Sequence, residues 1–249
     1  MQNTTNILNN KSAKSITAAI VLAASMLTVS TDASAYDLKS NTIYANATGG
    51  IYEIDLNTAV ATKVADTNAS LSSIQDIAFD GDILYGINLH WQLLKLEPHQ
   101  DTTVAVNEAS SYSLQFQGLE ARDGVLYGAE KNLLVTIDQE TAAPGSLGPG
   151  SGSYGLGAGE VVTDLAFAAD GTLYASVQFP AIPYSYLGTI SLDTGELMLI
   201  GNTGVENITA VTVKDGVIYA MDKVGDLYTL NEVSGFATGV ASGVLPGVN

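Results

Sequence analysis

A short phrase that recurs five times limits what this chain can fold into. It consists of an apolar residue, a tyrosine and a small residue, and its tyrosines are Tyr44, Tyr85, Tyr127, Tyr174 and Tyr219. Successive tyrosines are 41, 42, 47 and 45 residues apart. A period of this length is typical of architectures in which each repeat forms one structural unit and the units stack on their neighbours.

Most of these phrases follow a turn signal and precede a second β-rich run. The turns are Asp123-Gly124, Asp170-Gly171 and Asp215-Gly216, with Asp80-Gly81-Asp82 in the second repeat. Asp-Gly between apolar runs predicts a β-hairpin, because glycine readily adopts the positive φ that such turns require. The runs that follow the tyrosines span 50–54, 93–96, 133–137, 188–192 and 227–230. Four repeats also begin with an apolar run, at 74–79, 118–121, 162–167 and 208–213.

Each repeat therefore predicts an inner strand, a tyrosine strand, a third strand and an outer strand, which is the pattern of a propeller blade. We expect an all-β fold in which residues 36–249 form a single small β-propeller of five four-stranded blades. The first inner strand is short, at 36–39. The tail through Pro246 to Asn249 either completes the inner edge of the first blade or leaves the ring imperfectly closed. A parallel β-solenoid is the competing fold, although its coils are usually shorter than these repeats.

The wording of the repeats resembles the Asp-Gly-x-Leu-Tyr-Ala … Leu-Tyr-x-Ile-Asp-x-x-Thr-Gly blades of secreted bacterial propellers, the loose group that includes NHL-like and quinoprotein-like proteins. The resemblance covers nearly all of residues 42–242. It implies a fold and is nearly silent on function. Quinoprotein blades carry tryptophan docking positions, which are missing here because residues 36–249 contain only Trp91. The resemblance therefore does not imply a pyrroloquinoline quinone cofactor.

The first 35 residues have the pattern of a cleaved export signal. Lys11 and Lys14 precede an apolar run over 16–29, and Ala33-Ser34-Ala35 supplies the small-x-small pattern of a cleavage site. The run is shorter than the ~20 residues that a membrane-spanning helix needs. A retained anchor helix is the alternative, and it would not require the Ala-Ser-Ala sequence. We predict cleavage after Ala35 and a mature chain that is secreted or periplasmic, with no membrane anchor.

The composition is strongly acidic, with 26 Asp and Glu against 9 Lys and Arg. Residues 36–249 carry 25 acidic and 7 basic side chains, and Arg122 is the only arginine. A nucleic-acid partner is therefore not expected, because binding phosphates requires clustered Lys and Arg. The acidity is explained either by solubility or by cation binding. No cysteine is present, so packing alone must hold the domain together.

The irregular insertions all fall on one predicted end of the propeller. The connections between tyrosine strand and third strand, and between blades, belong to this variable face, whereas the Asp-Gly turns lie opposite. Function on a rigid repeat scaffold usually sits on such loops. Six aromatic residues there are candidates for contacting a protein or glycan partner, or else pack the loops onto the sheets. They are Trp91, Tyr112, Tyr154, Phe179, Tyr184 and Tyr186.

Two aspartates occupy matching places in their repeats, within Gln75-Asp76-Ile77 and Thr163-Asp164-Leu165. Both fall near the start of an inner strand, where a side chain can face the central channel. With Glu120, Asn207 or backbone carbonyls they are candidates for holding Ca²⁺, which prefers oxygen ligands. They could equally cap backbone N–H groups.

Catalysis has little support in the sequence. The only histidines are His90 and His99, which are predicted to lie at opposite ends of the propeller, and no zinc-type spacing exists. No Cys nucleophile and no Gly-x-Ser-x-Gly elbow occurs. The first hypothesis is therefore an exported, non-enzymatic binding module. The alternatives are a Ca²⁺-dependent hydrolase or lactonase with its site at the channel mouth, and an extracellular structural or matrix protein.

Overall fold

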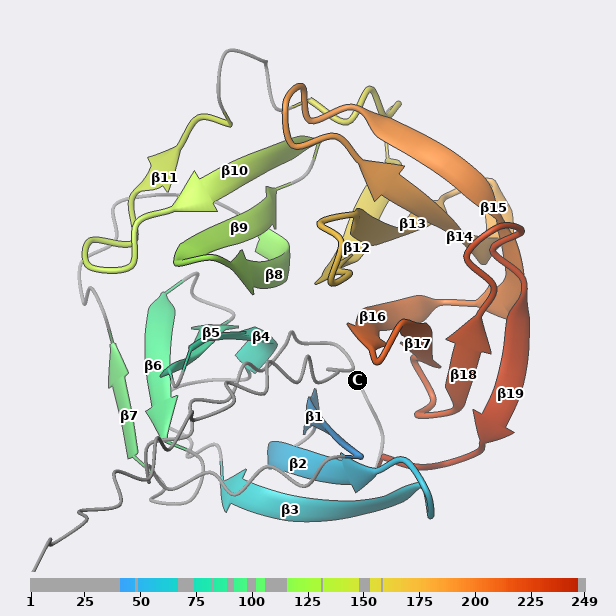
Figure 1. Cartoon of the computed structure of the whole chain (residues 1–249), viewed down its shortest axis with the longest axis horizontal. Coiled ribbons are helices and arrows are strands. Elements are labelled where there is room, and N and C mark those ends of the chain that lie inside the picture. Colours follow the sequence, from blue (N-terminus) through green and yellow to red (C-terminus); the bar gives the residue numbers. More distant parts are fainter. Residues whose placement is uncertain are drawn as a thin grey trace, which may run out of the picture.

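Five small antiparallel sheets stand around a central axis like the blades of a propeller (Figure 1). The computed structural model describes residues 41–47, 49–66, 74–81, 83–88, 92–97, 102–105, 116–130, 132–147, 153–157 and 159–245. Throughout these residues the secondary structure is strand, turn and bend, which confirms the predicted all-β propeller with five blades. None of them belongs to a helix long and apolar enough to cross a membrane. The predicted signal at 1–35 and the predicted inner strand at 36–39 lie outside the described residues.

The blades follow one another in sequence order, and neighbouring strands within each blade pair in chain order. Blade 1 contains β1 (Thr42–Ala47), β2 (Gly50–Asp55) and β3 (Val60–Asp66). Blade 2 contains β4 (Ile74–Asp80), β5 (Ile83–Asn88), β6 (Leu93–Glu97) and β7 (Thr102–Ala105). Blade 3 contains β8 (Phe116–Arg122), β9 (Val125–Glu130), β10 (Leu133–Ile137) and β11 (Pro144–Gly145). Blade 4 contains β12 (Val161–Phe167), β13 (Leu173–Phe179), β14 (Ile182–Ile190) and β15 (Leu197–Glu206). Blade 5 contains β16 (Ile208–Lys214), β17 (Val217–Asp222), β18 (Leu227–Leu230) and β19 (Ala237–Ala241).

The recurring phrase forms the second strand of blades 2 to 5 and the first described strand of blade 1. In two of the five phrases the small residue is glycine, and side chains of the same blade leave no room for a larger residue. A Cβ atom on Gly86 would lie 2.8 Å from Leu96 Cδ1, and one on Gly128 would lie 2.5 Å from the ring of Phe116. Interiors packed to crystal-like density leave no room for such an atom. A small residue therefore recurs at this position because neighbouring side chains leave little space beside the second strand.

Two of the predicted Asp-Gly turns are present as two-residue hairpin loops. Asp123 and Gly124 have φ values of 52° and 81°, and Asp215 and Gly216 have values of 51° and 78°. Two consecutive left-handed residues are what a two-residue hairpin loop needs to match the twist of its strands. These turns set the register between inner strand and tyrosine strand in blades 3 and 5.

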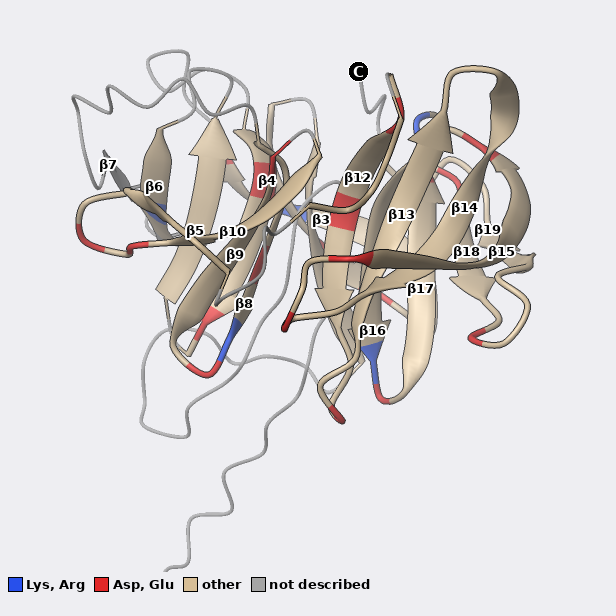
Figure 2. Ribbon diagram, turned by 90° about the horizontal axis from the view of Figure 1, so that it is seen from above, with Lys and Arg blue, Asp and Glu red and all other residues tan. Residues whose placement is uncertain are grey.

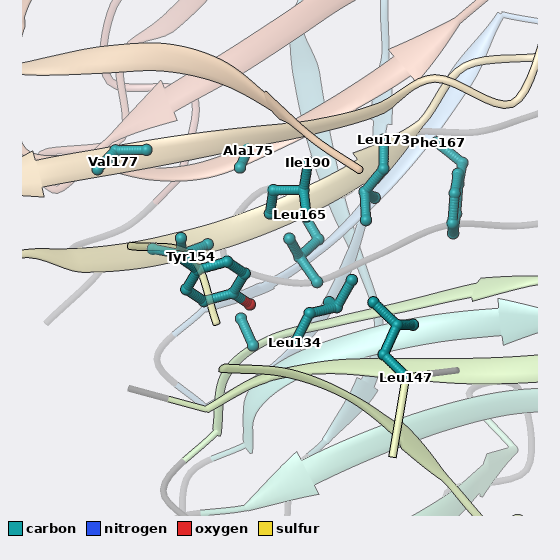
Figure 3. Close-up of a cluster of buried hydrophobic side chains, with 11 residues drawn as sticks. Leu134, Leu147, Tyr154, Leu165, Phe167, Leu173, Ala175, Val177 and Ile190 are labelled. Atoms are coloured by element: carbon teal, nitrogen blue, oxygen red, sulfur yellow. The ribbon is translucent and has the colours of Figure 1, made fainter. Parts of the chain in front are cut away.

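The hydrophobic core is divided among the interfaces between blades. Between blades 3 and 4, for example, Leu134 and Leu147 meet Leu165, Leu173 and other buried side chains (Figure 3). Similar clusters join blade 1 to blade 2, blade 2 to blade 3 and blade 4 to blade 5. Each blade is thus stabilised mainly by its neighbours.

The ring is closed between blade 5 and blade 1 by the end of the described chain. The amide of Gly243 donates to Asp226 Oδ1 (2.7 Å), and the amide of Val244 donates to the carbonyl of Gly225 (2.8 Å). Leu245 is then buried in a cluster with residues of both blades, including Ile43 and Met221. Residues 243–245 therefore fill the seam by packing. Pro246 to Asn249 lie outside the described residues.

Candidate functional site

Among the described members of the six predicted aromatic residues, the exposed one is Tyr184, at the tip of the β13–β14 hairpin. The Asp-Gly turns after β8 and β16 lie together at one end of the ring (Figure 2). The β13–β14 connection belongs to the opposite end, because β13 runs away from the Asp170-Gly171 turn. At this tip Ile182 and Tyr184 are 38% and 41% exposed. Large apolar side chains at this degree of exposure form contact surfaces when they cluster.

Phe179 and Tyr186 support the tip from below. Their rings pack edge to face, with centroids 5.1 Å apart and planes inclined by 80°. The amide group of Asn202 donates to the Tyr186 hydroxyl at 3.4 Å. An edge-to-face pair stabilises by about 0.5–1.5 kcal/mol beyond its buried area. Tyr184, two residues before Tyr186, therefore projects from a fixed base.

Two further contacts hold the hairpin in place. A Cβ atom on Gly159 would lie 2.9 Å from Pro180 Cγ, so the tip is pressed against the chain entering blade 4. At the base, Ser185 Oγ accepts a hydrogen bond from the amide of Ile208 (2.9 Å), and Thr203 Oγ1 donates to the Ser185 carbonyl (2.8 Å). The hairpin is thereby tied to β15 and to the inner strand of blade 5.

The remaining aromatic candidates are placed differently. Tyr154 is buried in the cluster between blades 3 and 4 (Figure 3), where its ring packs against apolar side chains. This position matches the alternative in which the aromatic residue packs a loop onto the sheets, so we leave Tyr154 out of the candidate surface. Trp91 and Tyr112 lie outside the described residues, as do His90 and His99.

Asp76 and Asp164 are both buried on inner strands and bind backbone amides of neighbouring blades. Asp76 Oδ1 accepts from the amide of Ile77 (2.9 Å), and Oδ2 accepts from the amide of Leu119 in blade 3. Asp164 Oδ1 accepts from the amide of Leu165 (2.8 Å), and its Oδ2 accepts from the amide of Val211 in blade 5 (2.7 Å). The two aspartates thus join blade 2 to blade 3 and blade 4 to blade 5.

The two carboxyl groups are close enough for the ionisation of each to affect the pKa of the other. Burial raises the pKa of Asp76 well above its usual range, and the charge of Asp164 raises it further. Burial likewise raises the pKa of Asp164, partly offset by its bonds from Val211 and Leu165. Burial is also the main cause of the raised pKa of Glu120, which lies on β8 between them in the ring.

The hydrogen bonds of Asp76 and Asp164 are relevant to the predicted Ca²⁺ site, because they occupy the same carboxyl oxygens that would bind the ion. Every carboxyl oxygen of Asp76 and Asp164 already accepts a backbone hydrogen bond. Among the described residues no three His, Cys, Asp or Glu side chains are arranged to hold a metal ion. Asn207, the other predicted ligand, adopts a left-handed conformation with φ of 52° at the junction of β15 and β16. The arrangement agrees with the alternative in which both aspartates cap backbone N–H groups.

The sequence did not identify the backbone amides that donate to these aspartates, or the closeness of their two carboxyl groups. A signal was available, because Asp76 and Asp164 alternate with Gly118 and Ala210 at the same repeat position. A Cβ atom on Gly118 would lie 2.9 Å from Asp164 Cα. The small residues therefore give the neighbouring aspartates room to reach the next amide.

Comparison with known proteins provides no family. No protein-family model matches the chain, and no curated protein matches it. Among solved structures, an oligogalacturonate lyase in complex with manganese is 13% identical with a TM-score of 0.43, over 82% of this chain and 62% of its own. YCF48 from Cyanidioschyzon merolae is 10% identical with a TM-score of 0.47, over 80% and 65%. BamB from Moraxella catarrhalis is 17% identical with a TM-score of 0.38, over 79% and 59%. The chain spans less than two thirds of each of these proteins, and likenesses of this size carry no functional conclusion.

Proposed function

We propose that this chain is an exported binding module that holds a protein partner on the variable face of its propeller. The observation that carries the proposal is the exposed Tyr184 on a hairpin tip whose base is fixed by the Phe179–Tyr186 pair. A tyrosine contributes a large amphipathic contact area and has few rotatable bonds, so ordering it on binding costs little entropy. Export rests on the sequence pattern of residues 1–35.

A fixed scaffold is what makes such a tip effective. Association loses free energy for every side chain and loop that must be ordered, so a surface that is already ordered binds more tightly for the same area. The bonds of Ser185 and Thr203 and the contact of Pro180 with Gly159 supply that order. Trp91 and Tyr112 remain predicted members of the same surface.

We do not extend the proposal to a Ca²⁺-dependent hydrolase. The carboxyl oxygens of Asp76 and Asp164 are engaged by backbone amides, and both side chains are buried. A general acid or base must reach its substrate within hydrogen-bonding distance. The described geometry offers no such access to this pair.

The test is affinity capture with the mature chain as bait, using exported proteins from the source cells and quantitative mass spectrometry. Wild type is compared with Tyr184→Ala and with the matched control Val60→Ala, which truncates an exposed side chain on the outer strand of blade 1. Because a central tyrosine commonly contributes more than ~1 kcal/mol to an interface, we expect the Tyr184→Ala variant to lose at least several-fold of the captured partner.

A parallel glycan array separates the two partner classes. If a glycan binds to wild type and not to Tyr184→Ala, the partner of the hairpin tip is a carbohydrate and not a protein. Equal capture by wild type and Tyr184→Ala, with both variants folded by circular dichroism, would overturn the proposal.

A further inference from the structure

A second exposed apolar surface lies on the outer rim of blades 4 and 5, away from the hairpin tip. It consists of the outer strands β15 and β19 and the turn that precedes β19, which follow one another along the outside of the ring (Figure 1). Met198 and Val233 are 70% and 80% exposed, and Phe236 is 60% exposed. Val240 is also exposed. We call these four residues the rim patch.

The two halves of the rim patch are packed together. The ring of Phe236 lies over Gly204 of β15, where a Cβ atom would approach it to 3.3 Å. A Cβ atom on Gly201 would lie 2.1 Å from the carbonyl oxygen of Ser234. Backbone in such close contact holds the turn of blade 5 against the face of β15 that also carries Met198.

Two of the other outer strands carry features that protect a sheet edge against association. Charged side chains and proline are the common means of protecting a sheet edge. In blade 1, β3 carries the ion pair between Lys63 and Asp66, and in blade 3, β11 has two residues, one of them Pro144. By contrast, residues 197–205 and the whole of β19 contain no charged residue and no proline. β-bulges at positions 200 and 240 interrupt the backbone pairing of β15 and β19. A partner would therefore contact the side chains of these strands and not their backbone.

The charges around the rim patch are of one sign. Glu196 immediately precedes β15, and Glu232 lies in the turn beside Val233. Residues 159–245 carry ten acidic and two basic side chains, and one of the basic ones, Lys214, is buried (Figure 2). A second copy of this chain would bring these carboxylates against one another, which is unfavourable.

We infer that the rim patch docks a second protein partner, one that presents an apolar surface flanked by lysine or arginine. The apolar centre supplies the area, and Glu196 and Glu232 select the sign of the partner's charge and accelerate its approach. The inference goes beyond the proposed function, because it assigns a different surface with a different chemistry. An interface of this kind is apolar at its centre and polar at its rim.

The test is selection from a random peptide library displayed on phage, with the mature chain as target. We expect the enriched peptides to combine apolar residues with flanking Lys or Arg. Their affinity, measured by fluorescence anisotropy, should fall about tenfold or more in Met198→Lys and Val233→Lys, because each adds a repelling charge and removes apolar contact. Both positions are strongly exposed, so the fold is expected to tolerate the change.

Val60→Lys is the matched control, since it makes the same change on an outer strand that lies outside the rim patch and is 58% exposed. Enriched peptides without basic residues, or with equal affinity for Val233→Lys, would overturn the inference. Self-association of the wild type that Val233→Lys abolishes would replace the basic partner by a second copy. Peptides lost in Tyr184→Ala but retained in Met198→Lys would belong to the hairpin tip instead, which keeps the two proposals distinguishable.

Discussion

Asp164 of blade 4 accepts a 2.7 Å hydrogen bond from the backbone amide of Val211 in blade 5. Asp76 of blade 2 makes the equivalent bond to Leu119 of blade 3, two interfaces away. A propeller of this kind is stabilised mainly between its blades, and at these two interfaces a buried carboxyl adds a bond that a purely apolar inner strand could not make. The stability of the ring therefore depends on two side chains whose chemistry also makes it sensitive to pH.

Replacing Asp164 by leucine should destabilise the domain strongly. The change leaves the amides of Leu165 and Val211 buried without an acceptor, and each unsatisfied donor costs about 1–3 kcal/mol. We expect the free energy of unfolding, measured by urea titration, to fall by about 2 kcal/mol or more. The exposed Glu232→Ala is the control and should change it by less than ~0.5 kcal/mol. An Asp164→Leu variant as stable as wild type would refute a stabilising role for this residue.

Stability should decrease as pH rises from mildly acidic to alkaline conditions. Burial raises the pKa of Asp76, Asp164 and Glu120 above their unfolded values of about 4. Above an unfolded-state pKa the folded state binds more protons than the unfolded state, so the free energy of unfolding falls as pH approaches the folded pKa. Below the unfolded values this contribution is complete.

The Asp76→Asn variant isolates the aspartate pair in this pH profile. Its amide cannot ionise, so the decline of melting temperature with pH should be shallower than in wild type. The exposed Asp193→Asn should leave the slope unchanged. A wild-type slope retained in Asp76→Asn would show that the pair does not titrate as the buried geometry requires.

Leu245→Ala should weaken the seam between blade 5 and blade 1. Leu245 is 2% exposed and packs against residues of both blades. Removing a buried leucine side chain typically costs about 2–5 kcal/mol. We expect a matching loss in guanidinium unfolding, whereas Val233→Ala, at a side chain that is mostly exposed, should have little effect. Equal stability of the two variants would mean that the tail does not close the ring.

Alanine substitutions at two glycines distinguish the cost of backbone strain from the cost of steric crowding. Gly124 has φ of 81° with nothing within 4 Å of a built Cβ, and Gly239 has equally open surroundings without a positive φ. Gly124→Ala should therefore lower the free energy of unfolding by about 1–2 kcal/mol, since alanine disfavours the left-handed region. Gly239→Ala should be neutral or slightly stabilising. Thermal melts of both variants check the difference, and a loss of the same size in both would refute it.

Short-range signals in the sequence were enough to predict the local structure of this protein. The tyrosine phrase, the Asp123-Gly124 type of turn and the apolar alternation are short-range signals, because strand periodicity and turn chemistry act within a few residues. They were enough to predict five blades and their strand order. They also placed the aromatic insertions of blade 4 at one end of the propeller.

Which of these residues contact one another depends on the tertiary structure. Asp76 and Asp164 are 88 positions apart, and their carboxyl groups come together only because the inner strands converge on a narrow axis. Tyr154 and Tyr184 were both predicted to lie in loops of the variable face, yet Tyr154 is buried between blades and Tyr184 is exposed at a hairpin tip. Leu245 closes the seam only because blade 5 ends beside blade 1. Contacts between blades depend on the radius and closure of the whole ring, and no window of local sequence contains that information.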